Sequence, residues 1–296
     1  MDNFMQQFCQ QLINGISLGS IYALIALGYT MVYGIAKMIN FAHGDIIMVG
    51  AYALYVFAAV LGLPVPLCIL LTIVFCAVLG ITVERIAYKP LRKAPSLAVL
   101  ITAIGVSYFL QNMALLIFKA TPIPFRSVIQ MPTIEVGGIH ISGITIVTFV
   151  ITAITMIVLT WFINKTKAGS AMRAVSEDKG AAELMGINVN KTISLTFAIG
   201  SALAAIAGIL FISQYESLYP TLGAMPGIKA FVAAVLGGIG SIPGAMLGGI
   251  VLGIIESLSK AYISTQLADA IVFGVLVLVL LVKPSGLLGK MKIEKV

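Results

Sequence analysis

The sequence predicts an all-α integral membrane protein, a polytopic helix bundle of about eight hydrophobic segments that includes broken or re-entrant elements. Of its 296 residues, 60% are hydrophobic and only 10% are charged, and the mean hydropathy is +1.09. Soluble domains carry about 25% charged residues, whereas a membrane-spanning helix needs roughly 20 predominantly apolar residues. The apolar runs do not alternate with polar residues as the strands of a membrane barrel do. They cover residues 12–33, 46–63, 67–83, 96–118, 144–163, 192–214, 228–255 and 262–282.

Basic residues predict which side of the membrane each connection faces. The formal net charge of +7 comes from 18 Lys and Arg against 11 Asp and Glu. Such an excess is typical of cytoplasmic loops and does not by itself indicate nucleic-acid binding. Counting back from these loops places residues 1–11 outside. The clusters that we expect to be cytoplasmic follow the third run, separate the fifth run from the sixth and end the chain: Arg85, Lys89, Arg92 and Lys93; Lys165, Lys167, Arg173, Lys179 and Lys191; Lys283, Lys290, Lys292 and Lys295.

Two interrupted segments predict a transport path. If the sixth run ends outside and the last run begins there, residues 228–255 must enter and leave from the same side. At about 1.5 Å per residue this segment is too short for two full spans, and glycines with a proline interrupt its middle. The stretch 34–50 is irregular as well, and paired interruptions of this kind are typical of transport paths. The candidate path residues are Asn40, His43, Asp45, Gly237, Gly238 and Gly240.

Two of these residues have a simpler, structural interpretation, which we favour. His43 could form a polar cap on the second helix, and Asp45 in its first turn would stabilise the helix dipole. A gate close to the path is the alternative for the same pair.

Ionisable and catalytic residues are scarce in the predicted spans. Lys229, Glu256 and Asp269 lie near segment ends, so no relay of titratable groups predicts proton-coupled transport. The glycine-rich stretch 237–244 lacks the lysine of a phosphate-binding loop, and the two His and three Cys show no metal-site spacing. We expect a transporter with no cofactor bound to this chain and no enzymatic activity.

The connection 164–191 contains a short helix with a cap at each end. A helix of about two turns is marginal by itself, so we expect it to pack into a groove on a cytoplasmic partner. A solvated connector is the alternative. Asp178 is the predicted N-cap of this helix. Ala181, Leu184 and Met185 share one face at helical spacing, and Gly186 follows the helix as its C-terminal cap.

Several motifs in a fixed order resemble one family of membrane proteins. The sequence is similar, nearly end to end, to the permease subunit of the branched-chain amino acid ABC importers, which take up leucine, isoleucine and valine. It resembles the H-type permease more than the longer partner permease. The motifs are NGISLGSIYAL at 14–24, INFAHGD at 39–45, GAY at 50–52, ER at 84–85, PLR at 90–92, the loop 173–188, GGIGSIPG at 237–244 and KPSGLLG at 283–289.

The resemblance implies a type II-like ABC importer permease, with one transmembrane domain over residues 1–296 in the bacterial cytoplasmic (inner) membrane. It implies an assembly with a second homologous permease subunit, two cytoplasmic ATPase subunits that hold ATP and Mg, and an extracytoplasmic substrate-binding protein. By motif position, the connection 164–191 would couple this chain to an ATPase. The coupling residues would be Arg173, Glu177, Asp178, Ala181, Ala182, Met185 and Gly186.

The implied mechanism is alternating access, in which ATP binding moves the coupling helix and the broken elements change the side to which a central cavity opens. A permease or facilitator for another small neutral solute, such as urea or short amides, is the alternative. An ATPase requirement for uptake would exclude the facilitator. An intramembrane enzyme would need a polar cluster that the sequence does not contain.

Overall fold

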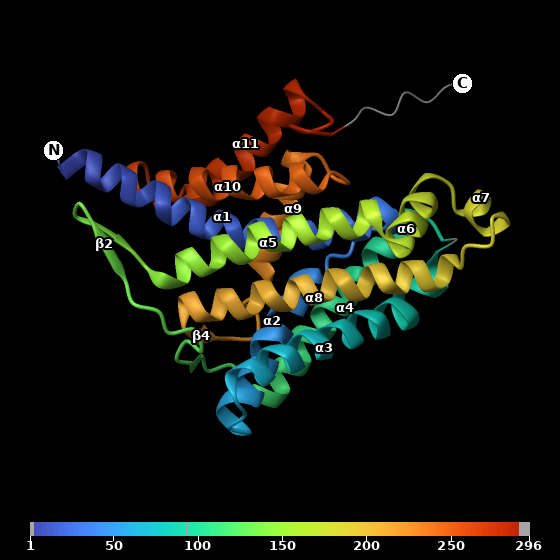
Figure 1. Ribbon diagram of the computed structural model, residues 1–296, viewed down its shortest axis with the longest axis horizontal. Helices are drawn as coiled ribbons and strands as arrows, with labels where there is room; N and C mark the ends of the chain where they lie inside the picture. Colours follow the sequence, from blue (N-terminus) through green and yellow to red (C-terminus); the bar gives the residue numbers. More distant parts are fainter. Residues whose placement is uncertain (1–2, 93, 290–296) are drawn as a thin grey trace.

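The computed structural model describes residues 3–92 and 94–289, and it consists mainly of helices (Figure 1). Four short strands form two antiparallel pairs, β1 (Ile123–Pro124) with β4 (Ser217–Leu218) and β2 (Ile134–Val136) with β3 (Ile139–Ile141). A π-helical turn, Val56–Val60, extends α2, and the turns Glu84–Tyr88 and Lys89–Leu91 extend α3. The helices are α1 (Asn3–Ala36), α2 (His43–Tyr55), α3 (Val65–Val83), α4 (Ser96–Phe118), α5 (Gly143–Lys165), α6 (Lys167–Glu177), α7 (Lys179–Leu184), α8 (Val189–Tyr215), α9 (Ala224–Gly237), α10 (Ile242–Tyr262) and α11 (Ala268–Val282).

Some residues of the predicted charge pattern lie outside the described residues. They are Met1 and Asp2 of the outer tail, and Lys93, Lys290, Lys292 and Lys295 of the cytoplasmic clusters.

The predicted polytopic helix bundle is confirmed. Seven helices of the described residues are long and apolar enough to cross a membrane, and α9 and α11 are shorter apolar helices. The break predicted within 228–255 is present, because α9 ends at Gly237 and α10 begins at Ile242. Its extent was predicted wrongly. The helix α10 continues to Tyr262 and is by itself long enough to span the membrane. Of the two helices on either side of the break, only α9 is therefore too short to span.

Side chains form N-terminal caps at the starts of α6, α8 and α10. The hydroxyl of Thr166 accepts from the backbone N–H of Gly169 at the start of α6, at 3.0 Å. Asn188 does the same for α8 and Ser241 for α10. Each of these side chains satisfies a backbone donor that has no partner within the helix.

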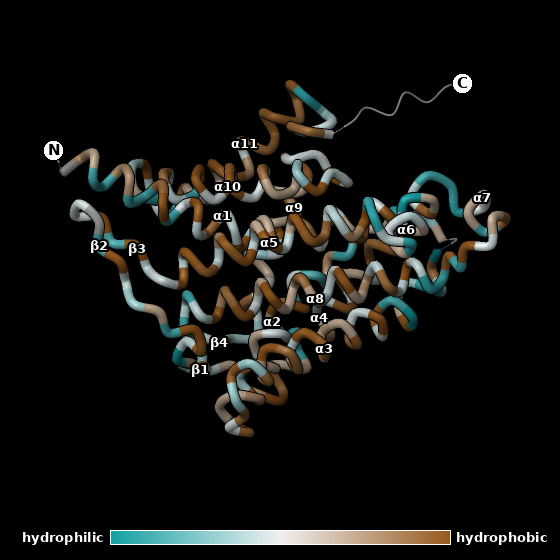
Figure 2. The backbone as a smooth tube through the Cα atoms, viewed as in Figure 1, coloured by the Kyte–Doolittle hydropathy of each residue, from teal (hydrophilic) through white to brown (hydrophobic). Residues whose placement is uncertain are grey.

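The basic clusters gather at one end of the bundle. Arg92 follows α3, Lys167 begins α6 and Lys191 lies in the first turn of α8, at the right-hand end of Figure 1. In Figure 2 hydrophilic segments surround α6 and α7 at this end, and the long helices between the two ends are mostly hydrophobic. Because cytoplasmic loops collect Lys and Arg, we assign this end to the cytoplasmic side and the end with the strand pairs to the outer side.

Two helices, α2 and α9, begin in the middle of the bundle. His43, the first residue of α2, packs against Gly28 of α1 and Gly28 in turn faces Gly200 of α8, both far from the ends of their helices. The segment before α9 returns to the same depth, since Gly223 packs on Gly44. From this point α2 runs toward the outer end and α9 runs toward the cytoplasmic end.

The two halves of the chain therefore repeat one arrangement in opposite directions. In the first, α1 runs inward, an extended segment returns to mid-depth, and α2, α3 and α4 follow. In the second, α8 runs outward, a segment returns to mid-depth, and α9, α10 and α11 follow (Figure 1). The helix α5 and the cytoplasmic helices α6 and α7 connect the halves. Inverted repeats of this kind are typical of transporters, whose sites lie where the repeats meet.

The first helix forms the core of the bundle. In its most apolar window, 94% of α1 is buried. It packs antiparallel on α10 through glycines: a Cβ on Gly15 would lie 2.7 Å from the Cα of Ile254, and one on Gly19 would lie 2.7 Å from the Cα of Ile250. Small residues permit such close approach in membranes. In α4 and α5 only 17% of the corresponding window is buried, so these helices face lipid or a partner chain.

An ion network lies inside the second half of the chain, where the sequence predicted charges only near segment ends. Glu256 of α10 is 1% exposed and accepts from Lys229 of α9 at 2.8 Å, from Lys260 at 2.6 Å and from the hydroxyl of Tyr22 at 2.9 Å. Lys229 also pairs with Asp269 at the start of α11, at 2.7 Å. The network therefore joins α1, α9, α10 and α11. Asp269 alone of the predicted trio begins a helix and is half-exposed.

Replacing Gly19 by Leu is expected to prevent close packing of α1 on α10, because a larger side chain would meet backbone that cannot move aside. The yield of monodisperse protein extracted in mild detergent should fall at least about fivefold. Gly274→Leu is the matched control, since a Cβ there meets nothing within 4 Å. Equal yields of the two variants would contradict the packing role.

Replacing one charged residue of the ion network should lower the stability of the fold more than replacing two of them together. Glu256→Ala leaves Lys229 buried beside fewer anions, and we expect it to lower stability by about 3 kcal/mol. The double variant Lys229→Met with Glu256→Met removes the buried charges together and should recover part of that loss. Thermal unfolding in detergent measures both, and a double variant no better than the single one would show that the buried charges are not coupled.

Candidate functional site

The starts of α2 and α9 meet at glycines. A Cβ on Gly44 would lie 2.6 Å from the carbonyl oxygen of Gly223, and a Cβ on Gly227 would lie 2.7 Å from the Cα of Gly44. Any larger residue at these positions would push the two helices apart. Because the positive ends of both helix dipoles point to this region, it is suited to groups that carry or develop negative charge.

A cavity of about 550 Å³ opens beside this contact, between α2, α4 and α9. Its walls are largely apolar, and the polar groups come from the first turn of α2 and one side of α4. Ligand sites combine apolar walls with a few convergent polar groups in this way. The lining residues are Phe41, Gly44, Asp45, Leu100, Ile104, Ser107, Tyr108, Gln111, Ala224 and Ile228.

Asp45 is the charged residue of the cavity wall. It lies in the first turn of α2 and is 2% exposed. Its Oδ1 accepts from Nε2 of Gln111 at 2.8 Å, and the same Nε2 donates to the hydroxyl of Ser107 at 3.3 Å. No ion pair of the described residues includes Asp45. This carboxylate is therefore held in place by a neutral amide.

The other two candidates near the start of α2, Asn40 and His43, make contacts outside the cavity. Asn40 is buried, and its Oδ1 accepts from the hydroxyl of Tyr88 at 2.7 Å. The His43 ring packs edge-on against Tyr29, and its Nε2 has no hydrogen-bond partner. The predicted cap is not formed by His43: the N-cap residue is Ala42, and α2 has no side-chain cap. Neither Asn40 nor His43 lines the cavity beside Asp45.

The three predicted glycines form a turn at the cytoplasmic end. Gly237 ends α9, and Gly238 and Gly240 have φ values of 103° and 96°, which favour glycine. The carbonyl of Gly237 accepts from the N–H of Leu288 at 2.9 Å, which attaches the segment after α11 to this turn. The second interruption is thus not this turn but the segment 216–223, which leads from β4 at the outer end to Gly223 at mid-depth. A role of the three glycines in the path stays a prediction.

The cytoplasmic helices present an exposed apolar pair. Asp178 caps α7 as predicted, its Oδ1 accepting from the N–H of Ala181 at 2.9 Å, and Gly186 follows with φ of 81°. Leu184 and Met185 are 90% and 83% exposed. Charged and small residues around this pair complete the surface.

Two of the predicted coupling residues are engaged within the chain. Ala182 is 3% exposed and packs inward, unlike its exposed neighbour Ala181. The guanidinium of Arg173 donates to the carbonyl of Ile163 in the last turns of α5, and to Ser170 at 3.1 Å. Glu177 and Asp178 are exposed at the junction of α6 and α7. The exposed residues of this region, called the docking surface below after the role predicted for it, are Glu177, Asp178, Ala181, Leu184, Met185 and Gly186.

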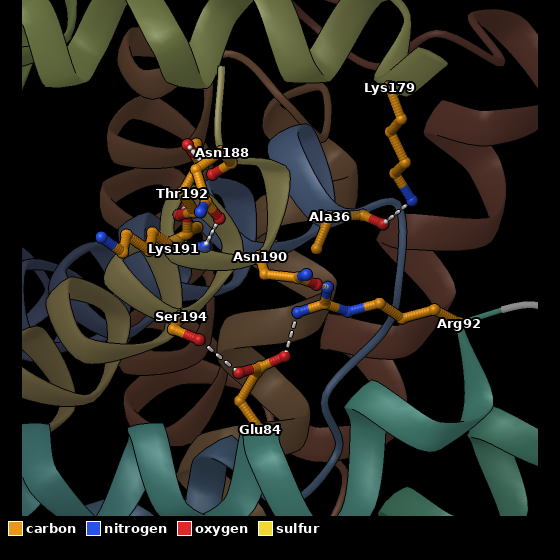
Figure 3. A network of polar contacts seen from close by, with 10 residues as sticks. Ala36, Glu84, Arg92, Lys179, Asn188, Asn190, Lys191, Thr192 and Ser194 are labelled. Carbon is orange, nitrogen blue, oxygen red and sulfur yellow. Dashed lines mark hydrogen bonds and ion pairs between the residues drawn. The ribbon is translucent and has the colours of Figure 1, made fainter. Parts of the chain in front are cut away.

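A polar network ties α7 to the membrane helices (Figure 3). Nζ of Lys179 donates to the carbonyl of Ala36, the last residue of α1, at 3.0 Å. Nearby, Glu84 binds Arg92 and accepts from Ser194 at 2.6 Å, which joins the end of α3 to α8. Burial and the neighbouring charges of Arg92 and Lys37 lower the pKa of Lys179.

A second cavity, of about 380 Å³, lies at this end. Its wall includes Lys37, Arg92 and Lys179, and Leu100 lines both this cavity and the one beside Asp45. The two cavities thus follow one another along α4 from mid-depth to the cytoplasmic end.

The sequence reasoning missed Ser107 and Gln111. Both lie in the apolar run 96–118, four residues apart and hence on one face of a helix. Two polar residues at that spacing inside a span are a signal for a polar lining.

Comparison with known proteins places the chain in a family. The family model described as "Branched-chain amino acid transport system / permease component" matches residues 11–280. A high-affinity branched-chain amino acid transport system permease protein, BraD of Pseudomonas aeruginosa, is 47% identical over 98% of both chains. The corresponding protein LivH of Escherichia coli is 46% identical over 98% of both chains. A probable branched-chain amino acid transport permease protein of Methanocaldococcus jannaschii is 29% identical over 93% of this chain and 90% of that protein.

The match extends over the first repeat, the cytoplasmic helices and the second repeat, including the cavity between α2, α4 and α9. This multi-pass membrane chain therefore belongs to the family of permease components of branched-chain amino acid transport systems.

Proposed function

We propose that this chain is the membrane permease of an ABC importer that moves leucine, isoleucine and valine inward. The cavity of about 550 Å³ between the starts of α2 and α9 carries the proposal. It lies where two inverted halves meet, and its mostly apolar walls suit an aliphatic side chain. The full-length similarity to branched-chain amino acid permeases supports the same substrate class.

The docking surface of α6 and α7 fits a cytoplasmic ATPase subunit. An exposed apolar pair next to acidic side chains is suited to a groove with an apolar floor and a basic rim. In this proposal two such ATPases hold the ATP and Mg, a second permease completes the pathway, and an extracytoplasmic binding protein delivers the amino acid. The assembly lies in the bacterial cytoplasmic membrane.

The contact between Lys179 and Ala36 offers a route for the motion. Displacement of α7 by the ATPase would pull on the end of α1 and on the segment 37–42, which leads directly into α2. Because α2 begins at the cavity, its movement would change the side to which the cavity opens. ATP hydrolysis would then reset the arrangement.

Reconstitution tests the proposal. The tagged chain should co-purify with two ATPases and a second permease, and vesicles that contain the complex should import radiolabelled leucine only with ATP and the loaded binding protein. Uptake by the purified chain alone, without ATP, would instead identify a facilitator.

Charged substitutions on the docking surface should separate the ATPase from the membrane subunits. Replacing Leu184 and Met185 together by Asp is expected to weaken ATPase co-purification at least about tenfold, because exposed apolar anchors dominate such contacts. Met131→Asp, at an exposed residue before α5 on the outer side, is the matched control. Unchanged co-purification of the double variant would place the ATPase contact elsewhere.

A further inference from the structure

We propose that the carboxylate of Asp45 binds the α-ammonium group of the amino acid as it passes through the cavity. This inference rests on the proposed function and gives one residue of the cavity a defined chemical role. It depends on the contacts of the buried carboxylates, on the hydrogen-bonded pair of Asp45 and Gln111, called the Asp45 pair below, and on the residues that line the cavity.

Asp45 differs from the other buried carboxylates of the described residues. Glu84 and Glu256 are 0% and 1% exposed, and each is paired with basic side chains: Arg92 for the first, Lys229 and Lys260 for the second. Asp45 is 2% exposed, yet its side-chain partners are neutral groups, the amide of Gln111 and the hydroxyl of Ser107. A carboxylate at membrane depth without a cation is costly, and such residues belong to substrate or ion pathways. The missing cation is what an ammonium group would supply.

The Asp45 pair is oriented for a cationic ligand. Nε2 of Gln111 donates both to Asp45 and to Ser107, so the amide hydrogens are used within the protein and the amide oxygen is left as an acceptor. The carboxylate, the amide oxygen and the hydroxyl of Ser107 together offer several acceptors on one wall. An ammonium group brings three donors and no acceptor.

The remaining walls suit the rest of an amino acid. Ala224 lines the cavity as the first residue of α9, and the start of this 14-residue helix favours a carboxylate. Leu100, Ile104 and Ile228 supply apolar surface for a branched side chain. The ammonium group of the zwitterion would thus face Asp45 at the start of α2, and its carboxylate would face the start of α9.

Neutralising Asp45 tests this role in the assembled transporter. In vesicles that contain the permeases and ATPases, with loaded binding protein outside, we expect Asp45→Asn to lower the leucine imported per ATP hydrolysed at least about tenfold. Co-purification of the ATPases with Asp45→Asn should stay within about twofold of the unmodified complex, because the docking surface is unchanged. Asp45→Glu, which keeps the charge, should retain part of the import. Glu135→Gln, which neutralises an exposed carboxylate on the β2–β3 hairpin, is the matched control.

The possible outcomes separate this inference from the proposed function. If the unmodified complex imports no leucine, the proposed function fails. If it imports leucine and Asp45→Asn does so with the same stoichiometry, the proposed function stands and the ammonium site is overturned. A loss of assembly and ATP hydrolysis that Asp45→Glu does not rescue would also overturn it, since Asp45 would then be a structural residue.

Discussion

Contact between Gly44 and Gly223 in the middle of the bundle is the constraint on which the other features depend. A helix that begins inside a membrane leaves its first backbone N–H groups without helical partners, and lipid cannot satisfy them. Two such starts are tolerated here because each packs on the other and on α1, and α2 packs on α4 and α8 as well. The glycines permit that enclosure. The cavity exists because the same two starts leave space on their α4 side, where both helix dipoles present their positive ends.

Polar contacts hold α2 and α9, the two helices that begin in the middle of the bundle, in different ways. In the first half, Asp45 connects α2 to α4 through the neutral side chain of Gln111. In the corresponding place of the second half, Lys229 connects α9 to α10 and α11 through two carboxylates. Breaking a buried ion pair costs several kcal/mol, whereas a neutral hydrogen bond contributes about 1 kcal/mol. The fold is thus symmetric in topology and asymmetric in its polar contacts, with a neutral hydrogen bond at α2 where α9 has a buried ion network.

Local chemistry decided which parts of the fold and of the candidate site could be predicted from the sequence. The cap formed by Asp178 and the glycine after α7 depend on neighbouring residues alone, and both predictions are confirmed. The membrane runs are equally local, because they depend on length and hydropathy. The ion pair of Lys229 with Glu256 joins residues from two helices whose packing no local pattern reports.

Depth in the membrane was the main quantity that hydropathy could not supply. The segment 216–223 contains Glu216 and Pro220 and has the composition of an outer loop, yet it enters the bundle because protein rather than lipid surrounds it. Conversely, the glycines at 237–240 have the composition of a break within the membrane and lie at the cytoplasmic end. Asp45 was predicted as a candidate path residue, and the structure places it on the cavity wall. Its partner Gln111 lay within a run that average hydropathy described as uniformly apolar.

The burial of α1 against α10 also affects how the chain is made. The first helix is made well before the helix that covers its glycines, because 205 residues separate the end of α1 at Ala36 from the start of α10 at Ile242. At about 5–20 residues per second, ribosomes need roughly 10–40 s to complete that stretch. During this interval the face of α1 that contains Gly15 and Gly19 contacts lipid or the insertion machinery instead of α10. Membrane insertion of this protein is therefore a process in which the central helix enters well before its principal neighbour has been made.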